Sequence, residues 1–142
     1  MRKTVIQSYF YNIISIPIRV IKRVGIPIIS PFLTKKYYAM GQFSKFIRPG
    51  DTIIHCNDNT LAAFNSKTNE VKIVCVNCSA KELPITVDLT DFKKSNRNVK
   101  VIRTSGNLEN GENWAVLNDL DLTDNTFSTD LKGNSVTTFI IG

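Results

Sequence analysis

Three cysteines and one histidine are the residues of this chain that most often bind metals or act as nucleophiles. Cys75 and Cys78 form a C-x-x-C motif, which occurs in zinc sites and in thiol–disulfide chemistry. The motif falls in the run EVKIVCVN, which predicts a strand, and residues three apart in a strand face opposite sides. No second cysteine pair follows, and His55 and Cys56 lie in another predicted strand. We therefore interpret the cysteines as small apolar residues near a core, and we expect no metal and no cofactor.

Carboxylates are the next candidates, because a pair of them across a cleft can hydrolyse glycosidic bonds. The residues after position 50 hold four glutamates: Glu70, Glu82, Glu109 and Glu112. Two of them flank predicted strands, and Glu109 and Glu112 share a loop rich in Gly and Asn. Nothing in the sequence places two of them at a cleft, so we nominate no catalytic residue.

Trp114 is the single tryptophan of the chain. Aromatic rings that face solvent stack on sugar rings, so Trp114 is a candidate for carbohydrate contact. The residue lies in NWAVL, which is apolar after the ring, and a tryptophan in such a run is more often part of a core.

One helix and a series of strands must position these residues. Residues 36–47 have helical periodicity, with Met40, Phe43 and Ile47 on one face, and Pro49-Gly50 ends the helix. Short apolar runs separated by turn residues follow, at residues 51–56, 60–65, 71–77, 83–89, 99–104, 114–117, 126–131 and 135–141. About eight strands at this spacing predict an all-β fold, an antiparallel β-sandwich preceded by one amphipathic helix.

The alternation in LPITVDL predicts the register of one strand. Leu83, Ile85, Val87 and Leu89 are expected to point into the core, while Thr86 and Asp88 face solvent.

Residues 1–35 form a basic, apolar leader, which we expect to be irregular or helical and to be no domain. Residues 1–36 carry seven basic and no acidic side chains, whereas the rest of the chain has 11 basic and 12 acidic ones. No basic groove interleaved with aromatics is visible after residue 50, so we expect no nucleic-acid partner. Three prolines and three internal cations exclude a membrane span. Three interpretations of residues 1–35 remain. They are a degenerate or frame-shifted leader, a membrane-associating segment at residues 1–33, and a signal peptide.

Four segments carry a resemblance to a known family. They are KKYYAMGQFSKFIRPG (35–50), KIVCVNCSAKELPITVDL (72–89), VKVIRTSGNLENGENWAVL (99–117), in which GEN lengthens a loop, and SVTTFIIG (135–142). In this order they resemble the C-terminal part of glycoside hydrolase family 30, which includes xylanases, glucuronoxylanases, galactanases and glucosylceramidases. The resemblance covers residues 35–142.

The resemblance implies what the helix belongs to. In that family a (β/α)8 barrel carries two catalytic glutamates, so residues 36–50 resemble the last barrel helix and residues 51–142 the side β-sandwich. Neither catalytic glutamate has a counterpart here, and the barrel is expected to be absent. The chain then resembles a non-catalytic fragment of a truncated or frame-shifted gene, whose parent enzyme is expected to be secreted and to act on a plant cell-wall polysaccharide such as xylan.

Two other functions stay open. A stand-alone carbohydrate-binding module would use the sandwich and Trp114, with polysaccharide as its partner. A small membrane-associated protein would use the basic leader. Because the helix face of Met40, Phe43 and Ile47 looks built to pack on a barrel, we also expect the isolated chain to self-associate.

Overall fold

The computed structural model describes residues 20–23, 26–29, 33–54, 56–92 and 98–142. The chain divides into two compact units, Met1–Tyr37 and Tyr38–Gly142, and each is described by itself.

The first unit contains a β-hairpin. Strands β1 (Val20–Arg23) and β2 (Ile26–Ile29) pair antiparallel, with Val20 opposite Ile29. The expectation of an irregular or helical leader is therefore wrong over these residues. β-Branched valine and isoleucine predominate in both strands, and such residues favour extended backbone over helix.

Helix α2 (Lys35–Phe46) confirms the predicted helix to within one residue at each end. Lys45 lies in its last turn, where a cation suits the helix dipole. The chain then turns at Gly50, whose φ of 100° is a conformation that side chains other than glycine rarely adopt.

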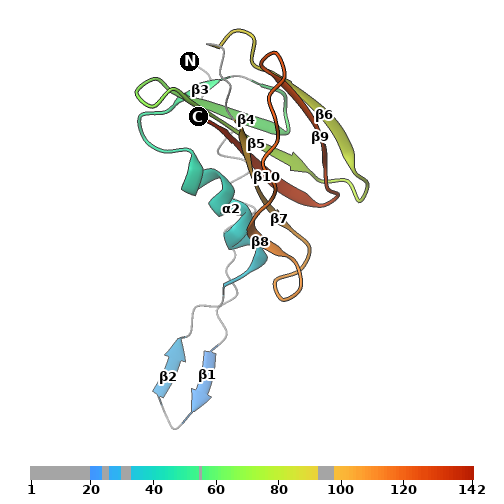
Figure 1. Cartoon of the computed structure of the whole chain (residues 1–142). Helices are drawn as coiled ribbons and strands as arrows, with labels where there is room; N and C mark the ends of the chain where they lie inside the picture. The colour runs from blue at the N-terminus through green and yellow to red at the C-terminus, as the bar shows by residue number, and fades with distance from the viewer. Residues whose placement is uncertain (1–19, 24–25, 30–32, 55, 93–97) are drawn as a thin grey trace. The chain divides into compact units, whose positions relative to one another are not determined.

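All eight strands expected after Gly50 are present, and they form two antiparallel sheets. The larger sheet has the order β3-β4-β5-β10-β7-β8. Its strands are β3 (Thr52–Ile54), β4 (Thr60–Asn65), β5 (Glu70–Asn77), β7 (Val99–Ser105), β8 (Glu112–Val116) and β10 (Ser135–Ile141). The smaller sheet pairs β6 (Leu83–Asp88) with β9 (Thr126–Leu131). The all-β sandwich is therefore confirmed (Figure 1).

The core lies between the two sheets. Phe139 of β10 is fully buried, and its ring centroid lies 5.1 Å from that of Phe127 on β9, with the two rings tilted at 51°. A central strand of the large sheet therefore meets the small sheet. Aliphatic side chains complete this core: Val71, Ile73, Val99, Val101, Leu131 and Ile141.

The predicted register of β6 is confirmed except at one end. Ile85 and Val87 pack against the core and Leu89 is buried, while Thr86 and Asp88 are exposed. Leu83, expected inside, is 45% exposed. It is the first residue of β6, at a corner of the two-stranded sheet, whereas Leu131 opposite it on β9 is buried.

Among the described residues, no helix is both long and apolar enough to span a membrane.

Candidate functional site

The contact between α2 and the large sheet depends on a buried glutamine. Gln42 is completely buried, and its Nε2 donates to Thr104 Oγ1 on β7 at 2.9 Å. Thr138 of β10 donates its hydroxyl to Gln42 Oε1 at 2.6 Å. Both ends of the amide are thus satisfied by neighbouring strands, which fixes the position of the helix along the sheet. Figure 1 shows α2 beside β7, β8 and β10.

Trp114 lies against the same helix at its glycine. A Cβ atom on Gly41 would be 2.8 Å from Trp114 Cε2 and 3.0 Å from Nε1, and closer still to Cζ2. The indole N–H donates to the Tyr38 carbonyl at 2.7 Å, and the Tyr38 ring meets the indole edge to face at 5.0 Å. Lys45 Nζ stands over the indole ring, 4.4 Å from its centroid. Helix residues therefore surround the ring, and its one donor is already used.

A bulge in the β7–β8 pair aims this ring at the helix. Arg103 pairs with Ala115 and Ser105 with Glu112, so Asn113 and Trp114 together face Thr104. Trp114 has a φ of 52°, which is unusual for a bulky residue and costs about 1–3 kcal/mol. Such a strained backbone persists only where its surroundings hold it, and here the contacts with α2 do so.

Glu112 is held by an ion pair at the start of β8. Arg103 donates two hydrogen bonds from one edge of its guanidinium, from Nε to Oε2 at 2.8 Å and from Nη2 to Oε1 at 2.6 Å. The Ser105 hydroxyl donates to Oε2, and Lys132 Nζ lies 3.4 Å from the same oxygen. The Arg103 hydrogen bond is the main cause that lowers the pKa of Glu112 to about 2. A carboxyl that is ionised throughout the neutral range cannot serve as a general acid, so Glu112 fastens β8 to β7.

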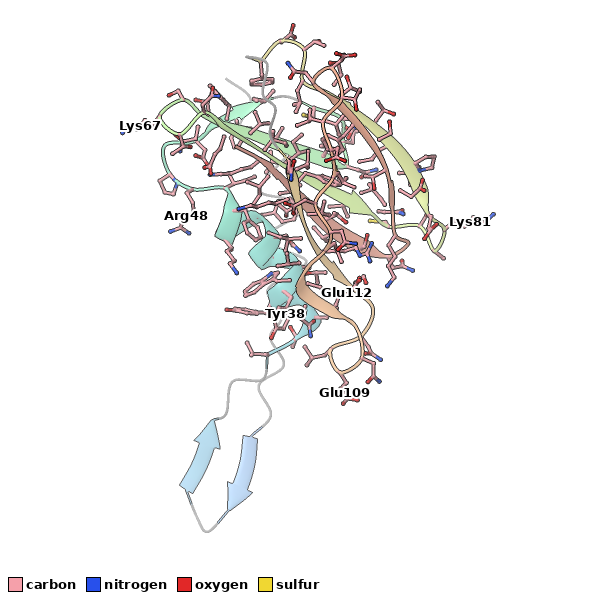
Figure 2. The ribbon with its side chains drawn as sticks, in the orientation of Figure 1. Tyr38, Arg48, Lys67, Lys81, Glu109 and Glu112 are labelled. Carbon is pink, nitrogen blue, oxygen red and sulfur yellow. The ribbon has the colours of Figure 1, made fainter. Side chains whose placement is uncertain are left out.

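Glu109, by contrast, lies in the exposed loop between these strands (Figure 2). Glu70 accepts a hydrogen bond from Thr68 Oγ1 at 3.0 Å, and Glu82 is exposed.

A second ion pair ties the end of the helix to the sheet. The Asp51 side chain is fully buried and accepts from Lys72 Nζ at 3.0 Å, Asn65 Nδ2 at 2.8 Å and the Arg48 amide at 2.9 Å. The amide of Arg48 is the largest cause that lowers the pKa of Asp51, against the effect of burial. Three donors thus keep this carboxylate charged inside the protein.

The three cysteines differ in their exposure to solvent. Cys75 is buried in β5, Cys78 is exposed beyond it, and burial raises the pKa of both Cys75 and Cys56. Among the described residues, no cluster of His, Cys, Asp and Glu could hold a metal ion. His55 lies outside the described residues.

The sequence pattern gave no sign of the residues that fix the helix. The periodicity of Met40, Phe43 and Ile47 points to one helix face, yet the residues buried against the sheet are Gly41 and Gln42. At about 100° per residue, this apolar face lies on the other side of the helix. The pair Gly41-Gln42, on the face opposite the apolar one, was the signal in the sequence that could have indicated a close contact on that side.

Comparison with known proteins finds sequence relatives for most of the chain. A glucuronoxylanase, XynC, from Bacillus subtilis strain 168 is 32% identical over 113 residues, which are 77% of this chain and 25% of that enzyme. No family model matches the chain.

Solved structures of family 30 xylanases also match about three quarters of this chain. The family 30 subfamily 8 xylanase Xyn30A from Clostridium acetobutylicum is 29% identical with a TM-score of 0.60, over 75% of this chain and 27% of that one. A family 30 endoxylanase from Clostridium papyrosolvens C71 is 26% identical with a TM-score of 0.59, over 76% and 28%. The match falls on the C-terminal part of the relatives, so the chain spans about a quarter of their length.

Proposed function

We propose that this chain, which matches the C-terminal helix and β-sandwich of family 30 glycoside hydrolases, is a non-catalytic accessory domain of such an enzyme. One observation carries the proposal: the similarity extends over 77% of this chain but only 25% of the glucuronoxylanase. In this proposal residues 36–50 are the last helix of a barrel, residues 51–142 are the sandwich, and residues 1–35 belong to neither.

The proposed task of the domain is to hold that helix rigidly. The Gln42 amide, the Trp114 ring and the Asp51 carboxylate each fix a different part of it to the sheet or to the strands that follow. Met40, Phe43 and Ile47 remain half-buried on the other side. Burying an apolar side chain is worth about 1.5–3 kcal/mol, so this face supports docking of a further domain.

A chimera tests the proposal. Residues 35–142 would replace the matched C-terminal segment of the Bacillus subtilis glucuronoxylanase, and glucuronoxylan hydrolysis would be measured. We expect the chimera to hydrolyse the polysaccharide and this chain alone to release no sugar. Gln42→Leu in the chimera should lower its activity or melting temperature, whereas Lys67→Ala, in an exposed loop between β4 and β5, should not.

Two results would reject the proposal. One is hydrolysis of xylan by this chain alone that is lost on Glu109→Gln or Glu112→Gln. The other is upstream DNA that encodes no barrel in any reading frame, since the proposal derives the chain from a truncated or frame-shifted gene.

Polysaccharide is the proposed partner, because the relatives are named for their action on xylan. Trp114 remains the predicted contact, although helix residues surround its ring in the structure. Affinity electrophoresis on xylan, comparing the chain with its Trp114→Phe variant, tests this prediction. Equal migration with and without xylan would count against a stand-alone binding module. Membrane association through residues 1–33 and self-association also remain predictions, to be tested by flotation with anionic vesicles and by light scattering.

A further inference from the structure

The loop between β7 and β8 is organised by one asparagine. Asn107 Oδ1 accepts the amide of Asn110 at 2.7 Å, and the Asn107 carbonyl accepts the amide of Gly111 at 3.1 Å. Asn113 Nδ2 closes the loop by donating to the Leu108 carbonyl at 2.9 Å. Asn107 therefore holds the backbone amide of Asn110 and the amide of Gly111, which belongs to the peptide bond that joins these two residues.

Asn110 is both followed by glycine and exposed to solvent, and no other asparagine of the chain has the first of these properties. Of the chain's asparagines, Asn110 alone precedes a glycine. Its side chain is exposed, whereas Asn77 and Asn125 are buried and hydrogen-bonded. A glycine leaves its own amide nitrogen open to approach and permits the backbone to bend toward the preceding side chain.

We propose that Asn110-Gly111 is a deamidation site whose rate is controlled by Asn107. The Gly111 nitrogen gives up its proton and attacks Cγ of Asn110, and the new C–N bond closes a succinimide ring. The Cγ–Nδ2 bond breaks, and the Nδ2 group takes up one proton and leaves as ammonia. Water then opens the ring at either carbonyl and leaves aspartate or isoaspartate. No oxidant, reductant or enzyme is required, and the Gly111 amide must first leave the Asn107 carbonyl.

The product differs from the asparagine in charge and, for isoaspartate, in backbone length. A new carboxylate appears two residues before Glu112, which already pairs with Arg103 and Lys132. Isoaspartate also adds one methylene to a loop in which Gly111 is so closely packed that a Cβ would lie 2.8 Å from the Asn107 amide. The loop cannot absorb both changes without a shift in the β7–β8 turn.

Peptide mapping by mass spectrometry tests the proposal on the full chain, aged at mildly alkaline pH. Asn118, exposed and followed by aspartate, is the internal control. We expect Asn110 to convert several-fold faster than Asn118. Asn107→Ala removes the side-chain bond to the Asn110 amide and keeps the carbonyl that binds the Gly111 amide, so we expect it to speed the conversion several-fold by loosening the loop. Asn110→Gln should abolish the product in this peptide.

The role of Asn107 has a separate test that does not depend on a variant folding. The wild-type chain in strong urea lacks the loop, so Asn110 should convert several-fold faster there than in the folded chain. Equal rates at Asn110 and Asn118 would overturn the site. Equal rates at Asn110 in the folded and the urea-unfolded chain would overturn the control by the loop.

Discussion

Replacing Gly41 by alanine sets two effects of opposite sign against each other. Alanine is about 1 kcal/mol better than glycine inside a helix, so propensity alone predicts a more stable protein. The added Cβ, however, would lie 2.8 Å from Trp114 Cε2, so the indole or the helix must move. Overpacking of this kind costs about 1–3 kcal/mol. Displacing the indole also weakens its hydrogen bond to the Tyr38 carbonyl, worth about 1 kcal/mol, and its edge-to-face contact with the Tyr38 ring, about 0.5–1.5 kcal/mol.

The losses exceed the gain, and we expect Gly41→Ala to reduce the free energy of unfolding by about 2 kcal/mol. Urea denaturation followed by circular dichroism measures it. Ser44→Ala, on the exposed side of the helix, is the matched control and should change stability by less than about 0.5 kcal/mol.

A double-mutant cycle isolates the steric cause. In a Trp114→Ala background the clash is gone, so Gly41→Ala should become stabilising by about 1 kcal/mol. If Gly41→Ala is as stable as the wild type, or destabilises equally in both backgrounds, the proposed contact between Trp114 and the helix is wrong.

Three further predictions concern the other contacts of the helix and of β8. Gln42→Leu leaves two buried threonine hydroxyls without their amide partner and should cost about 3 kcal/mol in urea denaturation, with Ser44→Ala as the control. Asp51→Asn leaves the Lys72 ammonium with Glu70, 3.9 Å away, as its remaining counter-charge, and should lower the free energy of unfolding by about 2 kcal/mol. Added salt should not cause a loss of this size in the wild type, because the Asp51 side chain is buried. Glu112 has a pKa of about 2 in the folded chain and 4.5 when unperturbed, so its contribution is complete above pH 4.5 and disappears as the pH falls toward 2. Because the Arg103–Glu112 pair is partly screened by solvent, we expect it to contribute about 1 kcal/mol to the free energy of unfolding. Lowering the pH should therefore reduce the stability of Glu112→Gln by less than it reduces that of the wild type.

The strands were predictable because turn residues interrupt the apolar runs at short intervals. Each of the eight runs after Gly50 forms a strand, and the alternation at Ile85, Val87 and Leu89 placed these side chains correctly in the core. The position of Leu83 was predicted wrongly because alternation says which side of a strand a residue faces, and nothing about how well the end of an edge strand is covered.

The helix contacts were not predictable for a different reason. Gln42 is satisfied by Thr104 and Thr138, 62 and 96 residues away in the sequence, and no local pattern records such partners. The left-handed backbone of Trp114 is equally hidden, because turn propensities assign such conformations to Gly, Asn and Asp. The pair Arg103–Glu112 joins residues nine apart across a hairpin whose bulge sets their register.

The position of Trp114 also means that the intrinsic fluorescence of the chain is sensitive to the contact between α2 and β8. The chain has a single tryptophan, and it touches the carbonyl and ring of Tyr38 and the ammonium of Lys45. Indole emission is quenched by nearby charged donors and shifts to longer wavelength when water reaches the ring. Intrinsic fluorescence of the unlabelled chain therefore reports on the seating of one helix, while far-ultraviolet dichroism reports on the sheets. A helix that lifts off before the strands separate would show as two transitions that fail to coincide.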